Sequence, residues 1–486
     1  MWLLLVAAAY VAAMSVAVVP RSALGWDESL YVSQVDPHTP AGYFSAPRAR
    51  GVTFLVAPMV RVTDSVPVLR AYLAVLAGVL LVAAFWPWLR AVRRPWLVPL
   101  AALLFSGLWV VLFYGASVMP NPWVAFGCLG AVGWFVRYGN RAADHRGVQE
   151  GNGAVRWAPV GVAAGLAFAT LMRPTDAFWV SVALGIVMLA SRRWRRPALW
   201  LAVVVGDALG FVPWLVESYL RFGGPAARLH RASGVEGGLS WHPLAALYEM
   251  RAVNGPLLCR PCDTHVTHPL LIIWWLAIPG FVIAGLLAAA RSRQLAALAI
   301  PAACGATLAA SYLLTVPYAA PRFLIPAYAL LALPIAGLLT WLIEALPRRL
   351  RVPAVGLLAL LLAVHLGLQA AVLIHQVDRH TGTALGYPPA AAALERLGVD
   401  KPCVIVGKDA VPIAYDMGCE SAAVIGNNKT TTDAGVLSMS HHARAAYVTH
   451  HAKPPKYLAS WRRHKLPTAP GEHQWYAFTP PWQVTV

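Results

Sequence analysis

The sequence predicts an all-α polytopic membrane bundle of about eleven transmembrane helices, followed by a small extracytoplasmic α/β domain. Hydrophobic residues fill 58% of its 486 positions and charged residues 12%, whereas a soluble domain carries roughly 25% charged residues. Apolar runs of about 18 to 24 residues recur along most of the chain, a length that matches a hydrocarbon core about 30 Å thick. Basic residues gather between these runs. Together, these observations predict a protein that crosses the membrane many times.

The apolar runs place the expected spans by length and hydropathy. They cover residues 2–19, 67–89, 96–118, 122–138, 157–173, 176–191, 197–217, 269–290, 294–316, 322–346 and 353–374. The first run lacks a basic N-terminal region and a small-residue cleavage site, so we expect a retained span rather than a removed signal peptide. Residues 1–375 therefore form the expected transmembrane domain.

Arginines occupy every second connection between the expected spans. They are Arg90, Arg93, Arg94, Arg137, Arg141, Arg146, Arg156, Arg192, Arg193, Arg195, Arg196, Arg291, Arg293, Arg348, Arg349 and Arg351. Because cytoplasmic loops are rich in Arg and Lys, this alternation predicts a cytoplasmic N-terminus. The opposite face then receives external loops at 20–66 and 217–268 and the C-terminal tail. The net charge of +18 thus reflects orientation in the cell membrane, and no basic region with interleaved aromatics indicates nucleic-acid binding.

The last part of the chain differs in composition from the rest. All six lysines lie between Lys401 and Lys465, which favours a separate extracytoplasmic α/β domain at 376–486. A helical pattern covers 389–399. Strand-like patterns cover 402–407, 420–425, 444–450 and 473–478.

Cysteine positions agree with an external tail. Cys403 and Cys419 lie in the same expected domain, where an oxidising compartment permits a disulfide. Cys259 and Cys262 lie in the external segment CRPCDTHVTH at 259–268. That segment favours a local disulfide; the alternative is a zinc site completed by its two histidines, which would have to wrap one ion within ten residues.

Two adjacent carboxylates, Asp27 and Glu28, stand in GWDESLY at the edge of the membrane, in a chain with only 21 acidic residues. They could cap a short helix that begins near Ser29. Alternatively, ionisable groups at membrane depth usually face a cavity and mark a function. An ionised carboxylate there could take the proton of an incoming hydroxyl as a general base.

Two arginines fall on the expected outer face. Arg322 begins a span in PRFLIPAYALLALP, and Arg173 stands at the corner LMRPTDAF. Such side chains often extend to the membrane interface without a specific role. A guanidinium at this depth also matches the oxygens of a phosphate, and its charge would stabilise a departing phosphate group.

Five segments occur in an order that resembles the GT-C superfamily of integral-membrane glycosyltransferases. They are GWDESLYV, VLRAYLAVLAGVLLV, LAFATLMRPTDAF, LGFVPWLVESYLRFGGP and PRFLIPAYALLALP, within residues 1 to about 375. The pattern is similar to the polyprenyl-phosphate-sugar-dependent branch that contains mannosyl- and aminoarabinosyl-transferases. The tail resembles no family that we can name.

The resemblance implies roles on the donor side of a site. Asp27 matches the acidic residue that orients or deprotonates the acceptor hydroxyl, with Glu28 beside it as a second catalytic candidate. Arg322 matches a position near the donor phosphate, and Arg173 and Tyr318 are expected to bind the same phosphate.

The resemblance also implies acceptor or sugar contacts, for which Asn121, Tyr31 and His242 are the candidates. The family often carries a second acidic residue at the start of the fourth span, where this chain has Asn121. An amide can bind a sugar hydroxyl but cannot act as a base or an anionic metal ligand. This departure leaves Asp27 to act alone and casts doubt on a metal-assisted scheme.

These inferences predict an inverting glycosyltransferase that moves a mannose- or arabinose-type sugar from a polyprenyl phosphate to an acceptor hydroxyl. The acceptor could be a glycan, a lipid or a protein, and inversion requires one base and one stabilised leaving group. Nothing in the sequence requires a cofactor, and a divalent metal is an alternative without residue support. A transporter or flippase for a lipid-linked substrate is the competing interpretation, although it would be expected to show internal symmetry. A membrane scaffold that displays the tail is a third.

Overall fold

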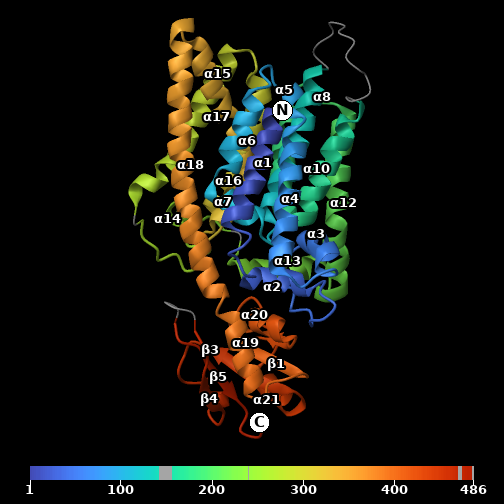
Figure 1. Ribbon diagram of the computed structural model, residues 1–486. Helices are drawn as coiled ribbons and strands as arrows, with labels where there is room; N and C mark the ends of the chain where they lie inside the picture. The colour runs from blue at the N-terminus through green and yellow to red at the C-terminus, as the bar shows by residue number, and fades with distance from the viewer. Residues whose placement is uncertain (142–155, 239, 267, 469–472, 484–486) are drawn as a thin grey trace.

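The computed structural model describes residues 1–141, 156–238, 240–266, 268–468 and 473–483. Figure 1 shows long helices side by side in one bundle, with a small region of strands and short helices beyond one end. The N-terminus and α5 (Trp88–Ala91) lie towards the opposite end of the bundle from that region. The external segments with α2 and α3 lie near it.

Every expected span contains helix. The bundle helices are α1 (Trp2–Ala17), α4 (Val66–Phe85), α6 (Leu97–Ser106), α7 (Trp109–Gly115), α8 (Asn121–Arg141), α10 (Ala158–Met172), α11 (Pro174–Ala190), α12 (Pro197–Phe222), α15 (Ile273–Arg291), α16 (Leu295–Thr315), α17 (Ile325–Ala345) and α18 (Arg348–Ala384). Within the described residues, six helices are long and apolar enough to cross a membrane, or seven if a bent pair counts as one span. The chain is thus a multi-pass membrane protein, and the number eleven stays a prediction.

The expected continuous span at 96–118 is wrong. The chain breaks after Ser106, and α6 and α7 meet at 76°. At the break, the N–H of Trp109 donates to the Gln369 side chain of α18 (2.9 Å), and its indole N–H donates to the Val253 carbonyl (3.0 Å). Gly107 lies so near α18 that an added Cβ would be 2.2 Å from Leu366. Contacts with distant segments therefore replace the continuation of the helix, and hydropathy alone does not reveal them.

The last bundle helix is longer than expected. α18 continues without interruption to Ala384, so the domain boundary placed at 375/376 falls inside a helix. A polar residue holds its C-terminal half in place, since Gln376 donates to the Asn254 carbonyl at 2.7 Å. The tail is thus joined to the bundle by continuous helix.

The two segments that the sequence predicts to be external contain helices rather than irregular loops. Residues 20–66 contain α2 (Trp26–Ser33) and α3 (Gly51–Val60), and residues 217–268 contain α13 (Pro225–Glu236) and α14 (Ala245–Ala252). All four are short, and α3 is apolar whereas α2, α13 and α14 carry many polar residues. Helices of this length depend on tertiary contacts for their stability. Of the predicted cytoplasmic arginines, Arg146 lies outside the described residues.

The C-terminal region contains a mixed five-stranded sheet with the order β2-β1-β3-β5-β4. The strands are β1 (Cys403–Gly407), β2 (Glu420–Ala422), β3 (Arg444–Thr449), β4 (Arg462–Lys465) and β5 (Tyr476–Thr479), with α19 (Tyr387–Arg396), α20 (Ala410–Met417) and α21 (Asp433–His442). β1 pairs in parallel with β2 and β3, while β5 runs antiparallel to β3 and β4. The four predicted strands and the helix are confirmed. The sequence did not reveal β4, because RRHK at this edge carries no apolar pattern.

Close contact between α8 and α10 depends on two glycines. A Cβ at Gly127 would lie 2.7 Å from the Gly165 carbonyl oxygen, and a Cβ at Gly165 would lie 2.7 Å from the Gly127 oxygen. Small residues let membrane helices approach in this way, so packing in the apolar phase can hold them together.

We therefore expect Gly165→Leu to destabilise the bundle by about 1–3 kcal/mol, the usual range for overpacking. Thermal unfolding of the purified protein in detergent measures the change. Gly185→Leu in α11 is the matched control, because nothing lies within 4 Å of a Cβ there. Equal stability of the two variants would contradict this account of the α8–α10 contact.

Candidate active site

Asp27 lies between two arginines from distant parts of the chain. One carboxylate oxygen, Oδ1, accepts a hydrogen bond from Arg48 Nη2 at 2.6 Å, and Oδ2 lies 3.5 Å from Arg322 Nη2. Burial opposes ionisation of Asp27, but the charges of Arg48 and Arg322 outweigh it and hold the pKa below its usual value. The side chain keeps 31% of its surface exposed. Asp27 is therefore an ionised carboxylate that solvent or a substrate can reach.

Glu28 is placed very differently. Its oxygens accept hydrogen bonds from the backbone N–H groups of Gly25 (2.9 Å) and Val118 (2.8 Å). Arg70 Nη1 and Nη2 donate to the same carboxylate at 3.1 and 2.8 Å. Burial works against its charge, yet Arg70, His380 and the Gly25 N–H hold the pKa of Glu28 below its usual value. Both carboxylate oxygens thus accept hydrogen bonds, and Glu28 joins α2 to α4 and to the segment before α8.

Arg70 completes this tie. Besides Glu28, it donates to the carbonyls of Ser22 (2.8 Å), Ala23 (2.6 Å) and Ala116 (3.0 Å). Its side chain is 1% exposed. The turn before α2 and the segment before α8 are thus fixed to one guanidinium, which sets the direction in which Asp27 projects.

A second buried network holds the backbone of Arg48. Arg228 of α13, fully buried, donates to the carbonyls of Ala46 (3.0 Å) and Arg48 (2.7 Å). Its charge is balanced by Glu217 at 2.9 Å. Arg50 meets the same carboxylate at 2.6 Å. α12 and α13 therefore position the segment that presents Arg48 to Asp27.

Arg322 is fixed from the other side of the site. It stands in the short 3₁₀ helix η2 (Pro321–Leu324), and its Nη1 donates to the Leu257 carbonyl at 3.2 Å. The N–H of Ala320 donates to the buried Glu249 carboxyl at 3.0 Å. Burial raises the pKa of Glu249 to about 8, although the Ala320 N–H and the Arg322 charge oppose this. A carboxyl that is neutral at pH 7 leaves the charge of Arg322 available to Asp27 and to a ligand.

The three residues expected at the donor phosphate surround one aromatic ring, that of Phe323. The guanidinium carbons of Arg173 and Arg322 lie 5.3 and 5.5 Å from its centroid. The ring of Tyr318 meets it edge-on at 5.6 Å. Arg173 also pairs with Asp176 at 3.6 Å, and the Tyr318 hydroxyl donates to Glu236. The structure thus gathers all three near Phe323, with Arg322 nearest to Asp27.

The predicted acceptor residues belong to three different segments: α2, the start of α8 and the segment before α14. Tyr31 is buried on α2, where the Arg48 guanidinium carbon lies 5.2 Å from its ring. Asn121 is fully buried at the start of α8, and neither atom of its side-chain amide has a hydrogen-bond partner within the described structure. The His242 ring forms a hydrogen bond with the Ser240 hydroxyl, and its backbone N–H donates to the Leu314 carbonyl. Of the three, only Tyr31 contacts a residue that touches Asp27.

The residues that set this geometry carry no motif that singles them out. Arg48, Arg50 and Arg228 lie in segments predicted to be external, which the positive-inside rule expects to be poor in arginine. Arginines at these positions therefore indicate a role other than orienting the protein in the membrane. Glu217 stands within a motif already singled out, LGFVPWLVESYLRFGGP, as its acidic member.

Both expected disulfides are present, Cys259–Cys262 and Cys403–Cys419. The first pair is bonded and cannot supply thiolate ligands, so the zinc alternative at 259–268 is wrong. Within the described residues, no group of three or more His, Cys, Asp or Glu side chains could hold a metal ion.

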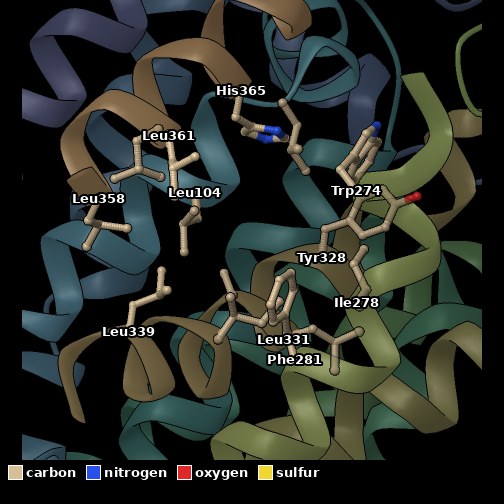
Figure 2. Close-up of a pocket in the computed structure, with 14 residues that line it drawn as sticks. Leu104, Trp274, Ile278, Phe281, Tyr328, Leu331, Leu339, Leu358, Leu361 and His365 are labelled. Carbon is tan, nitrogen blue, oxygen red and sulfur yellow. The ribbon is translucent and has the colours of Figure 1, made fainter. Parts of the chain in front are cut away.

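A partly open apolar pocket of about 300 Å³ lies between bundle helices (Figure 2). Fourteen residues line it: Leu104, Leu108, Trp274, Ile278, Phe281, Tyr328, Leu331, Ala332, Ile335, Leu339, Leu358, Leu361, Leu362 and His365. They come from α6, the break before α7, α15, α17 and α18. In Figure 2 the Tyr328 hydroxyl points away from the space, where it accepts a hydrogen bond from Trp275 at 2.9 Å. The pocket thus offers carbon surface within the membrane-spanning part.

We expect Arg70→Met to cost about 3–5 kcal/mol of stability, because it leaves the Glu28 carboxylate buried without its charged partner. Thermal unfolding in detergent reports the loss. Adding Glu28→Gln should recover part of it, since the uncompensated charge is then removed. Arg90→Met, at an exposed turn on the other end of the bundle, should change little. A mild effect of Arg70→Met alone would contradict the role given to this pair.

Comparison with known proteins identifies solved structures that share this fold. No protein-family model and no curated protein matches the chain. Among solved structures, ArnT from Cupriavidus metallidurans bound to undecaprenyl phosphate superposes with a TM-score of 0.65 at 14% identity, over 98% of this chain and 97% of ArnT. The archaeal oligosaccharyltransferase AglB from Archaeoglobus fulgidus, in complex with an inhibitory peptide and a dolichol-phosphate, gives 0.55 at 13% identity, over 99% of this chain and 74% of AglB. The chain therefore has the fold of ArnT and AglB over nearly its full length, and the resemblance to GT-C glycosyltransferases is confirmed at the level of the fold.

Proposed function

We propose that this protein is a membrane-embedded inverting glycosyltransferase that moves a sugar from a polyprenyl phosphate to an acceptor hydroxyl. The observation that carries the proposal is the contact between Asp27 and Arg322, residues 295 positions apart that meet at 3.5 Å. The pair brings a candidate base and a candidate phosphate-binding cation into one site. Inverting attack puts the base and the leaving phosphate on opposite faces of C1, so bound substrates would separate the two side chains. The shared fold with ArnT and AglB supports this assignment, since those two structures contain undecaprenyl phosphate and dolichol-phosphate.

Asp27 acts as the general base in this proposal. Its Oδ1 is held by Arg48, while Oδ2 has only the long contact with Arg322 and remains able to accept a proton. The acceptor oxygen attacks C1 of the sugar as its proton passes to Asp27. Glu28, the neighbouring candidate, has both oxygens occupied and serves as a positioning residue.

The leaving phosphate is stabilised by arginine. The bond between C1 and the phosphate oxygen breaks with its electron pair on that oxygen, and the new negative charge is met by Arg322. Arg173, whose guanidinium carbon lies 5.3 Å from the Phe323 centroid, adds positive charge, and Tyr318 orders the same aromatic cluster. Asn121, with an unsatisfied buried amide, and Tyr31 are proposed to contact the sugar or the acceptor, whereas His242 would contribute only to a more distant part of the acceptor path.

The apolar pocket gives the donor a place for its chain. Tyr328 lines it and lies six residues after Arg322, about 9 Å along the same helical segment. A polyprenyl chain that enters between α15 and α18 would bury carbon surface while its phosphate reaches Arg322. Each methylene buried contributes about 0.8 kcal/mol, so the chain supplies binding energy and the phosphate supplies position.

The arginine-rich turns and the candidate site lie at opposite ends of the bundle (Figure 1). With the N-terminus in the cytoplasm, as the positive-inside rule predicts, transfer would occur on the outer face. A flippase would use the same phosphate-binding arginines, but it would need no reactive carboxylate such as Asp27. The sugar is proposed to be of the mannose or arabinose type, and a glycan, a lipid or a protein could accept it.

Asp27→Asn should abolish transfer, because an amide cannot take the acceptor proton. General-base catalysis typically contributes about a hundredfold or more. The assay uses purified protein with a polyprenyl-phosphate sugar and measures released polyprenyl phosphate. The variant should still bind polyprenyl phosphate, and Asp64→Asn, an exposed carboxylate of the same external segment, is the matched control. Full activity of Asp27→Asn would exclude Asp27 as the base.

Arg48→Met should move the acid limb of the activity profile to higher pH. Burial favours the neutral form of Asp27, and the positive charge of Arg48 opposes it, so removing that charge raises the pKa of Asp27. The inactive protonated form then persists to higher pH. The pH dependence of kcat/KM tests this, with the exposed Arg61→Met as control. An unchanged or lowered acid limb would contradict the assignment of Asp27 as the titrating base.

A further inference from the structure

A buried disulfide lies directly beside the segment that carries Arg322. Cys259 and Cys262 are 2% and 9% exposed, and they pack with Ala252, Ala319 and Tyr248 in a small cluster of their own. We call residues 257–262 the disulfide arm. Leu257 packs against the bundle core, whereas the two cysteines belong to the small separate cluster, so the bridged part of the arm depends on local contacts for its shape.

Backbone pairing joins the arm to the Arg322 segment. The N–H of Cys259 donates to the Ala319 carbonyl at 2.8 Å, and the N–H of Ala319 donates back to Cys259 at 3.2 Å. Two residues before the bridge, the Leu257 carbonyl accepts the hydrogen bond from Arg322 Nη1. The arm therefore holds both the backbone just before Arg322 and the guanidinium itself.

Arg260, one of the two residues between the bridged cysteines, contacts the same cluster. The guanidinium carbon of Arg260 lies 4.6 Å from the ring centroid of Tyr318, and Nη2 donates to the Val235 carbonyl at 2.8 Å. Tyr318 in turn donates to Glu236. The arm thus also braces the tyrosine that packs against Phe323, and it connects this ring to the end of α13.

These contacts are few, and they depend on the shape of a short turn. A cross-link reduces the conformations open to such a turn when its other contacts are lost. Without the cross-link, the Leu257 carbonyl and the backbone hydrogen bonds between Cys259 and Ala319 are free to shift. Arg322 then loses two of the constraints on its position.

We propose that the Cys259–Cys262 bridge is a positioning element of the donor site, which holds Arg322 where it meets the donor phosphate. This rests on the proposed function. The bridge does not touch the reacting atoms and acts through the arm. Opening it should weaken donor use while the bundle stays folded.

The central experiment compares two full-length variants that each lack one bridge. Cys259→Ala/Cys262→Ala removes the arm bridge, and Cys403→Ala/Cys419→Ala removes the bridge of the C-terminal region as the matched control. We expect the first to lower kcat/KM for the donor ten- to a hundredfold, the scale of a misplacement of about 1 Å, mainly through a higher donor KM. The control and the acceptor KM should change little. Equal losses in both variants would overturn the proposal.

A double-mutant cycle with Arg322→Lys separates positioning of Arg322 from general loss of structure. If the bridge acts through Arg322, removing it in the Arg322→Lys background should cause little further loss. Multiplying losses would show an independent role and would contradict the proposal. Thermal unfolding of each variant confirms that the comparison involves folded protein.

Reduction provides a test without substitution in the arm. In the Cys403→Ala/Cys419→Ala variant, a dithiol reagent supplies two electrons and two protons to the Cys259–Cys262 bridge and itself becomes a cyclic disulfide. Donor use should fall on reduction and return on reoxidation, while the Cys259→Ala/Cys262→Ala variant stays indifferent. An unchanged rate after complete reduction, verified by thiol labelling, would refute the inference.

Binding of polyprenyl phosphate in detergent distinguishes failure of this inference from failure of the proposed function. If the wild type binds the lipid but transfers no sugar, the proposed function fails, and the arm is judged by whether its variant binds the lipid more weakly. If the two proteins bind it equally, the arm has no positioning role. If the wild type does not bind it, both proposals fall.

Discussion

The buried pair of Glu28 and Arg70 is the constraint on which the site depends. Both side chains lie where water cannot compensate their charges, so each is stable only because the other is present and because backbone groups saturate what remains. Arg70 uses its donors on Glu28 and on three carbonyls from two separate segments. The direction of α2, and with it the position of Asp27, follows from satisfying this one guanidinium.

The two adjacent carboxylates have different roles because they project from different faces of a short helix. Successive residues of an α-helix point about 100° apart, so Glu28 faces the bundle while Asp27 faces the external segments. Glu28 accepts four hydrogen bonds and therefore has a structural role. Asp27 has one strong contact and one long one, and it keeps part of its surface accessible. The same residue chemistry thus gives a fixed anchor and an available carboxylate.

The site is assembled by segments that each need support from elsewhere. Glu217 and Arg228 hold the backbone of Arg48, and the disulfide arm holds Arg322. The C-terminal region also reaches α2, because the Trp26 indole N–H donates to the Lys408 carbonyl at 2.8 Å. At 13–14% identity to ArnT and AglB, the shared fold does not carry residue roles across. These contacts within the chain are therefore the basis for the roles proposed here.

Local patterns in the sequence determined the membrane class, the positions of the bundle helices and four of the five strands, because hydropathy and periodicity act over short stretches of chain. Cysteine placement permitted the two disulfides but did not fix their pairing, which depends on geometry. Local patterns also singled out Asp27, Arg322 and Arg173, and the family resemblance added Tyr318. Only the tertiary structure decided the break between α6 and α7, the helices within the external segments, the edge strand β4 and the partners of Asp27. Each of those depends on residues far apart in the chain, such as Gln369 against Trp109 or Arg48 against Asp27, and contacts between distant segments leave no periodic trace in either one.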